Sequence, residues 1–483
     1  MSSTSAFAAP SRRRWLALGL IAAAQFMVIM DTSIIGVALP EIQQDLGFTP
    51  QGLSWVFNAY VVAFGGLLLL GGRLSDLLGA RRVFATGWVV LAAGSVVAGA
   101  ASSPAVELVG RAAQGAGSAL IAPAALTLLF TIFGATPREL TKALAVYGAA
   151  APAGGTAGVF LGGVLTQFAS WPWVFFINVP LAVVVVLLTP SVMPAGAARR
   201  GSVDVAGATT VTLGLASIVF AIVRAPQAGW TSTSTVVVGL VGLVMVGVFF
   251  VLQAKTHEPL VRLGILKAPN LAAANAAQFL LGAAWIPMFF FVNLYLQQVL
   301  GLGAFASGAA LLPLTVTIMV GMVTVAPRLI ARFGPKMLTV AGLATLAAGL
   351  TWLSLIRADG SFLLDVLPAS LVTASGMAMA FIPSLGLALS SAAPQEAGLA
   401  AGIVNTNYQI GSALGLAAMT AVAAAFGGDG PSTDLVGLTD GYSAALIGAA
   451  AIAAVGAVVA AAWLRTPATR TPAQVTADEQ VAA

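Results

Sequence analysis

The sequence predicts an all-α integral membrane protein with fourteen transmembrane helices, and three observations predict this class. First, 59% of the 483 residues are hydrophobic and only 8% are charged, whereas about 25% of residues are charged in soluble domains. Second, the mean hydropathy of the chain is +0.99. Third, apolar runs of about 20 residues, the length that crosses a bilayer as a helix, recur along the whole chain. The lipid bilayer is therefore the expected environment.

Each predicted helix is an apolar segment bounded by charged or Gly- and Pro-containing connections. The first follows SRRRWLALGL, which loosely resembles a twin-arginine signal, but its apolar run continues for about 25 residues and no A-x-A cleavage site closes it. We expect this segment to be retained as a helix. The fourteen segments are 15–39, 52–71, 83–101, 105–131, 143–167, 173–190, 205–225, 232–254, 271–298, 306–327, 337–357, 365–390, 398–426 and 442–464.

The distribution of Lys and Arg predicts the orientation of these helices. Eighteen of the 21 basic residues lie at the two ends of the chain and in alternate connections. Because cytoplasmic loops of membrane proteins are enriched in Lys and Arg, both termini are predicted to be cytoplasmic. Arg111 lies inside a span, and Arg224 and Arg357 lie at predicted outer ends.

An internal repeat predicts two halves. GGRLSDLLGARR at 71–82 matches APRLIARFGPKM at 326–337, with Gly79 aligned to Gly334, and both join the second and third helices of a six-helix set. Repeated halves with a site between them are typical of transporters. The predicted units are a cytoplasmic tail 1–14, a first half 15–190, a linker 191–270 holding the inserted helices 205–225 and 232–254, a second half 271–464, and a disordered tail 465–483.

Several protein classes are disfavoured by what the sequence contains. The chain has no Cys and a single His, so thiol chemistry is excluded and no metal site or catalytic cluster is indicated. It lacks the G-x-x-x-x-G-K-[ST] loop of nucleotide-driven pumps. Its pI of about 9.9 comes from residues in short connections rather than from a basic patch, so no nucleic-acid partner is expected. No enzyme activity and no cofactor are predicted.

Four motifs identify a family. They are MDTSIIGVALPEI (30–42), GRLSDLLGARR (72–82), RAAQGAG (111–117) and GGTAGVFLGG (154–163). On these motifs the sequence resembles the fourteen-helix drug:proton antiporters of the major facilitator superfamily, and the resemblance covers nearly the whole chain. It implies the major facilitator fold, alternating access and a proton as the coupling ion. The chain departs from the family pattern at Val159, where Pro is usual, and at Pro172 and Tyr408, where Arg is common.

Ionisable residues inside the predicted spans are the candidates for proton coupling. Asp31 lies about two-thirds of the way along the first segment, where inserting a carboxylate costs about 2.5–3.5 kcal/mol. Arg111 stays charged and needs a partner, which is either Glu107, one turn earlier, or Asp31. Gln114 would extend a polar path. The alternatives are a hydrogen-bonded structural Asp and a static ion pair; the resemblance implies that Arg111 takes part in proton transfer.

The loop motif and the glycine motif each have two interpretations. The resemblance implies that the loop after the second helix latches the outward-open state; the residues alone predict a basic cytoplasmic flank. The loop candidates are Gly72, Asp76, Gly79 and Arg81. The glycine motif either marks exporters at the seam between the halves, as the resemblance implies, or simply allows close helix packing. Its candidates are Gly154, Gly158, Gly162 and Gly163.

Polar and aromatic residues elsewhere are candidates for the substrate cavity, although some are expected to hydrogen-bond between helices instead. They are Asn58, Tyr60, Asn293, Tyr295, Gln298, Asn405, Asn407 and Gln409.

The function predicted from the sequence is proton-coupled export of lipophilic drugs, including antibiotics, by a monomer in a bacterial cytoplasmic membrane. The later helices carry no deep acid, so a neutral or cationic substrate is expected. The main alternative is a major facilitator importer or solute:proton symporter; a membrane enzyme and a non-transporting receptor are less consistent with the motifs.

Overall fold

The computed structural model describes residues 11–134, 137–195, 204–256, 259–260, 264, 270–391, 397–428, 430 and 434–465. In these ranges the regular elements are helices. The first half of the chain forms α1 (Ser11–Leu46), α2 (Pro50–Leu53), α3 (Trp55–Leu78), α4 (Ala80–Gly99), α5 (Pro104–Phe133), α6 (Pro137–Phe168), α7 (Trp173–Phe176) and α8 (Asn178–Val192), followed by α9 (Val205–Ala228) and α10 (Thr233–Lys255).

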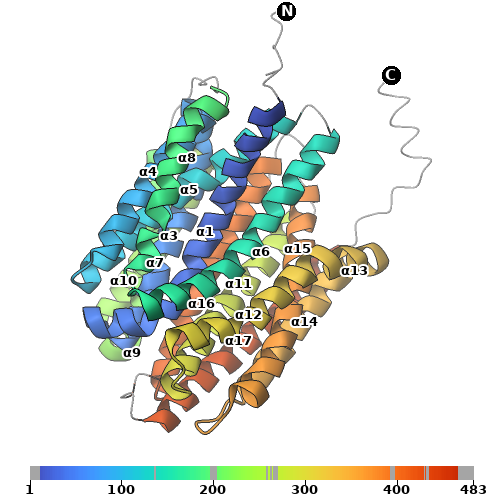
Figure 1. Ribbon diagram of the computed structural model, residues 1–483. Coiled ribbons are helices and arrows are strands. Elements are labelled where there is room, and N and C mark those ends of the chain that lie inside the picture. The colour runs from blue at the N-terminus through green and yellow to red at the C-terminus, as the bar shows by residue number, and fades with distance from the viewer. Residues whose placement is uncertain are drawn as a thin grey trace, which may run out of the picture.

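The second half contains three short π-helical segments as well as α-helices. Its elements are α11 (Leu271–Leu294), η2 (Tyr295–Val299), α12 (Ala304–Val320), η3 (Gly321–Val325), α13 (Ala326–Phe333), α14 (Pro335–Leu353), η4 (Phe362–Val366), α15 (Leu367–Ser391), α16 (Ala397–Ala425) and α17 (Leu435–Trp463). Helices α4 and α8 lie on the left of Figure 1, and α13 and α14 lie on the right.

The expected membrane-spanning segments are present as helices. Within the described ranges, thirteen helices are long and apolar enough to cross a membrane, and a shorter apolar stretch, Trp55–Leu68, lies in α3. The helices extend beyond the apolar runs of the sequence; α1, for example, continues to Leu46. This difference arises because the apolar run marks only the part that faces lipid or core, while helical hydrogen bonding continues into the polar flanks.

The repeated loop has the same backbone conformation in both halves. Gly79 has a φ of 89° and ends α3, and Gly334 has a φ of 79° and ends α13. A residue with a Cβ is strained at such angles, so glycine is required at both turns. In both halves the next helix starts directly after this glycine: α4 starts at Ala80, and α14 starts at Pro335. The sequence match between Gly79 and Gly334 therefore corresponds to a shared structural role.

Small residues let neighbouring helices approach closely. A Cβ at Gly71 on α3 would collide with the carbonyl oxygen of Ala119 on α5, and one at Gly158 on α6 would lie 2.7 Å from the carbonyl oxygen of Met30 on α1. Glycine at such contacts is typical of membrane helix packing. The two pairs α3–α5 and α1–α6 are among the most extensively packed in the first half.

Hydrogen bonds join the two halves near the end of the bundle where α1 finishes, the predicted outer end. The Asn293 side chain donates to the carbonyl oxygen of Gly36, and Gln297 Nε2 donates to that of Val37 at 2.9 Å. Gln298 donates to Gln43 Oε1 at 3.2 Å. Helices α6 and α12 also meet toward this end, where a Cβ on Gly163 would lie 2.9 Å from the Ala304 carbonyl oxygen. The structure is therefore closed at the predicted outer end.

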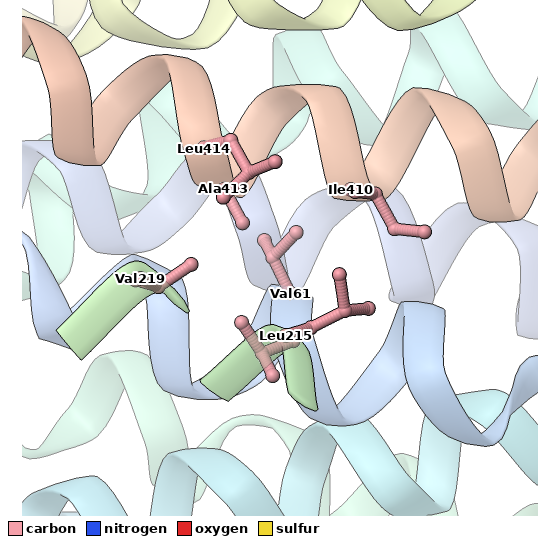
Figure 2. Close-up of a pocket in the computed structure, with 7 residues that line it drawn as sticks. Val61, Leu215, Val219, Ile410, Ala413 and Leu414 are labelled. Atoms are coloured by element: carbon pink, nitrogen blue, oxygen red, sulfur yellow. The ribbon is translucent and has the colours of Figure 1, made fainter. Parts of the chain in front are cut away.

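The inserted helices pack against both halves. Helix α9 contacts α3 and α16, and α10 packs on α9. Figure 2 shows the apolar side chains that converge from the three helices: Val61 on α3, Leu215 and Val219 on α9, and Ile410, Ala413 and Leu414 on α16. Gln253 Nε2 donates to Asp204 Oδ2 at 2.6 Å, which ties the end of α10 to the start of α9. The pair therefore covers the seam between α3 and α16.

Candidate functional site

A buried ion pair lies at the centre of the first half. Arg111 Nη1 on α5 lies 2.8 Å from Asp31 Oδ2 on α1, and neither side chain is exposed. A buried ion pair is stable only when further hydrogen bonds satisfy its remaining groups, because desolvation of both charges is costly. The surrounding polar groups provide such bonds for the carboxylate and for Nη1 and Nε of Arg111.

Two amide side chains donate to the same carboxylate. Gln114 Nε2 donates to Asp31 Oδ1 at 3.0 Å, and Asn178 Nδ2 donates to that oxygen at 2.6 Å. Both amides also donate to Ser95 Oγ, at 2.8 Å and 3.0 Å. Asp31 thus accepts hydrogen bonds from three side chains, counting Arg111.

The guanidinium of Arg111 is held by three further groups. Its Nη1 donates to Gln114 Oε1 at 2.7 Å, and its Nε donates to the Val56 carbonyl oxygen at 2.9 Å. The guanidinium carbon lies 4.7 Å from the ring centroid of Tyr60, within the range of a cation–π interaction. The planar, multidentate geometry of Arg suits this arrangement better than the single charge of Lys does.

Helical periodicity and small residues explain why these groups meet. Arg111 and Gln114 are three residues apart on α5, so they share one helix face. A Cβ at Gly94 on α4 would lie 2.7 Å from the backbone nitrogen of Gln114. Glycine there allows α4 to lie against α5, which brings Ser95 within reach of Gln114. The buried polar cluster formed by Asp31, Ser95, Arg111, Gln114 and Asn178 is called the Asp31 cluster below.

The structure decides between the two partners that the sequence allowed for Arg111. The ion pair is with Asp31 and not with Glu107. Glu107 is itself fully buried, and neither of its carboxyl oxygens has a hydrogen-bond partner. Gln114 joins the Asp31 cluster as expected. Three members of the network were not predicted: Ser95, Asn178 and the Val56 carbonyl. Asn178 lies in the stretch WPWVFFINVP (171–180), whereas no sequence feature distinguishes Ser95 from other helical serines.

The loop candidates lie at the predicted cytoplasmic end. Gly79 forms the turn between α3 and α4, and a Cβ on Gly72 would lie 3.8 Å from Pro123. Arg81 Nη1 donates to the Met193 carbonyl oxygen at 3.4 Å, which connects the loop to the end of α8. The side chain of Asp76 lies outside the described part of the structure. The latch role of these residues stays a prediction.

The glycine motif of α6 faces two different neighbours. Gly154, Gly158 and Gly162 pack against the carbonyl oxygens of Phe26, Met30 and Ile34 on α1, in the same half. Gly163 instead packs against Ala304 and Phe305 of α12, in the other half. Close packing therefore accounts for the first three glycines, and Gly163 lies at the seam between the halves.

Half of the eight cavity candidates hydrogen-bond to another helix, and these are Tyr60, Asn293, Gln298 and Asn407. Asn293 and Gln298 belong to the closed outer end, and Tyr295 donates to the Arg357 carbonyl oxygen at 2.7 Å. Tyr60 lies against Arg111 in the Asp31 cluster. The side chain of Asn58 is buried without a hydrogen-bond partner, and Asn407 donates to Asn275 Oδ1 at 2.8 Å. Asn405 and Gln409 are partly exposed on α16, where the Gln409 Cβ would lie 3.2 Å from a Cβ on Gly65.

A bundle of membrane-length helices with repeated loops in its two halves and a buried ion pair is typical of secondary transporters. The sequence model of the Major Facilitator Superfamily matches residues 21–416. The chain therefore belongs to the major facilitator superfamily.

Individual relatives agree with this assignment. The chain is 37% identical to the cephamycin export protein CmcT of Amycolatopsis lactamdurans, over 90% of this chain and 89% of that protein. It is 35% identical to the puromycin resistance protein pur8 of Streptomyces alboniger, over 93% and 91% of the two chains. Among solved structures, a point mutant of the nucleoside transporter NupG superposes with a TM-score of 0.65 over 94% of this chain and 100% of that one, at 15% identity, which supports the fold alone.

Proposed function

We propose that this chain is a drug:proton antiporter that exports lipophilic antibiotics or related drugs from the bacterial cytoplasm and thereby confers resistance. Relatives that align over nearly the whole chain carry names of antibiotic export and resistance. The proposed location is the cytoplasmic membrane, with both termini in the cytoplasm, because 18 of the 21 basic residues then lie on the inner side. The unit of transport is proposed to be the monomer.

The main observation that supports proton coupling is the ion pair between Asp31 and Arg111. It is fully buried in a helix bundle, where an ionisable residue is costly and usually functional. In the proposed cycle, a proton arriving from outside neutralises Asp31, and Arg111 loses its charged partner. Rearrangement of the two halves then exposes the carboxyl group to the cytoplasm, where the proton leaves. The proton is the coupling ion in this proposal, and no cofactor is proposed for the cycle.

Alternating access assigns a role to the closed outer end. Bonds such as Gln297 to Val37 hold the halves together there, so this conformation would load a neutral or cationic substrate from the cytoplasm or inner leaflet. Proton entry supplies the driving force, since moving one charge across 100 mV yields about 2.3 kcal/mol. An electroneutral exchange would use only the pH gradient.

Transport in inside-out vesicles tests this proposal. Vesicles with an acidic interior are given a lipophilic dye, and substrate-driven proton release is followed for the wild type and Asp31→Asn. The matched control is Asp365→Asn, because Asp365 also pairs with an Arg, Arg357, at 2.9 Å, but at the surface. We expect the dye to dissipate the proton gradient with the wild type and the control but not with Asp31→Asn.

Two results would contradict the proposal. Normal coupling by Asp31→Asn would show that this carboxylate is structural. Proton-driven flux in the opposite direction, out of inside-out vesicles, would favour the importer or symporter alternative.

A further inference from the structure

Glu107 is a buried acid that the proposed cycle does not yet use. It lies in the first turn of α5, its side chain is fully buried, and both carboxyl oxygens lack hydrogen-bond partners. A charged carboxylate in that position would bear a desolvation cost of several kcal/mol with no compensating bond. The neutral, protonated acid avoids most of this cost. The geometry therefore favours a proton on Glu107 in this conformation.

Arg111 is positioned to change partners. Its Nη1 and Nε are engaged with the Asp31 cluster and Val56, but its Nη2 is buried and has no partner. Glu107 precedes Arg111 by four residues, a spacing at which oppositely charged side chains on a helix pair readily. The free nitrogen and the free carboxyl group are thus on the same face of α5.

The two acids lie at different depths. Glu107 is four residues nearer to the start of α5 than Arg111, about 6 Å along the helix at 1.5 Å per residue. Since α5 starts at the predicted outer end, a proton from outside reaches the depth of Glu107 before that of Asp31. The charged groups that interact electrostatically with Glu107 are Arg111 and Asp31. The ring of Tyr60, which is also titratable, lies against the guanidinium of Arg111.

We propose that Glu107 is the outer acid of a two-carboxyl proton relay in which Arg111 alternates between Asp31 and Glu107. In the structure Glu107 is protonated and Asp31 is paired with Arg111. In the transfer step the O–H bond on Glu107 breaks, an O–H bond forms on Asp31, directly or through water, and Arg111 moves to the Glu107 carboxylate. The net charge of the three groups is zero before and after. This relay rests on the proposed proton coupling at Asp31.

Infrared difference spectroscopy of Glu107→Gln tests the protonation directly. A protonated carboxyl group without hydrogen bonds has a C=O stretch at distinctly higher frequency than a carboxylate. We expect this band in the purified wild type at neutral pH and its loss in Glu107→Gln. The matched control, Glu41→Gln, removes a partly exposed acid on α1 and should leave the band unchanged. A band that is absent from the wild type would overturn the assignment.

Transport assays separate a relay from a structural role. We expect Glu107→Gln to lower proton-driven transport by about a hundredfold or more, in the range of lost acid–base groups, while substrate counterflow, which needs no net proton movement, stays close to that of the wild type. Glu107→Asp should restore part of the driven transport. If Asp31→Asn uncouples the protein and Glu107→Gln does not, the relay is wrong and the proposed function stands. If the wild type itself shows no coupling, the proposed function fails first.

Discussion

Asp31 and Arg111 are 80 residues apart in the chain, yet their carboxylate oxygen and guanidinium nitrogen lie 2.8 Å apart, and both side chains are fully buried. Two amides donate to the carboxylate, and a serine accepts a hydrogen bond from each of them. The pair is therefore part of a shared polar network, in which Arg111 Nη2 has no partner, and changes to one member should affect the others.

Substitution of Arg111 should separate the role of charge from that of geometry. Arg111→Lys keeps a cation but cannot hold Asp31, Gln114 and the Val56 carbonyl in one plane, so we expect a folded protein with transport reduced about tenfold or more, equivalent to at least about 1.4 kcal/mol. Arg111→Ala leaves Asp31 charged and unpaired, which should lower the free energy of unfolding by about 3–5 kcal/mol. Substrate flux and unfolding in detergent measure the two effects.

The double variant provides the control for this prediction. Asp31→Asn combined with Arg111→Gln removes both charges, so it should be more stable than Arg111→Ala, because no unpaired buried charge remains. Equal stability of Arg111→Ala and wild type would show that the ion pair is not needed for folding.

The close contact of α6 with α1 predicts that two glycines of α6 differ sharply in how much their substitution by Ala destabilises the protein. A Cβ on Gly158 would lie 2.7 Å from the Met30 carbonyl oxygen, whereas one on Gly148 would meet nothing within 4 Å. Gly158→Ala should therefore force the helices apart and destabilise the protein by about 1–3 kcal/mol. Gly148→Ala should be neutral or slightly stabilising, because Ala favours the helix. Thermal unfolding of the purified variants measures the difference, and equal behaviour would contradict it.

The repeated turns predict that replacing their glycine lowers stability through backbone strain, even where no steric clash arises. Gly334 has a φ of 79°, a ψ of 160° and open space around its Cβ position, so the cost of Gly334→Ala comes from the positive φ of the backbone alone. We expect a loss of about 1–3 kcal/mol. Gly19→Ala, at a helical position that also has open space, should show no such loss. A similar result for both substitutions would argue against strain at the repeated loop.

Local patterns in the sequence predicted the helices, because membrane-length apolar runs and the positive-inside distribution are properties of single segments. The repeat was also readable, since Gly79 and Gly334 need the same unusual φ. Contacts between distant helices were less accessible. The i,i+4 spacing made Glu107 a natural partner of Arg111, but the ion pair forms with Asp31, because the guanidinium is directed to α1 and to the Val56 carbonyl of α3.

The structural roles of uncharged polar residues were harder to predict from the sequence than those of charged residues. Asn293 and Asn178 are both single amides in apolar stretches, yet one bonds across the seam between the halves and the other holds Asp31. Their roles depend on which helix faces them, and that information lies in the packing of the whole bundle rather than in the spacing of neighbouring residues. Ser95 illustrates the same limit, because its importance comes entirely from the two amides that meet it.

The position of α9 has a mechanical consequence for the proposed cycle. Helix α9 contacts α3 in one half and α16 in the other, so it cannot keep both contacts unchanged when the halves rotate. It must travel with one half and slide along the other, and aliphatic side chains such as Leu215 and Leu414 (Figure 2) permit sliding because their contacts are not directional. At another part of the seam between the halves, α6 and α12 meet directly. The two flanks of the transporter should therefore differ in friction and in access to lipid, although the repeat relates their helices.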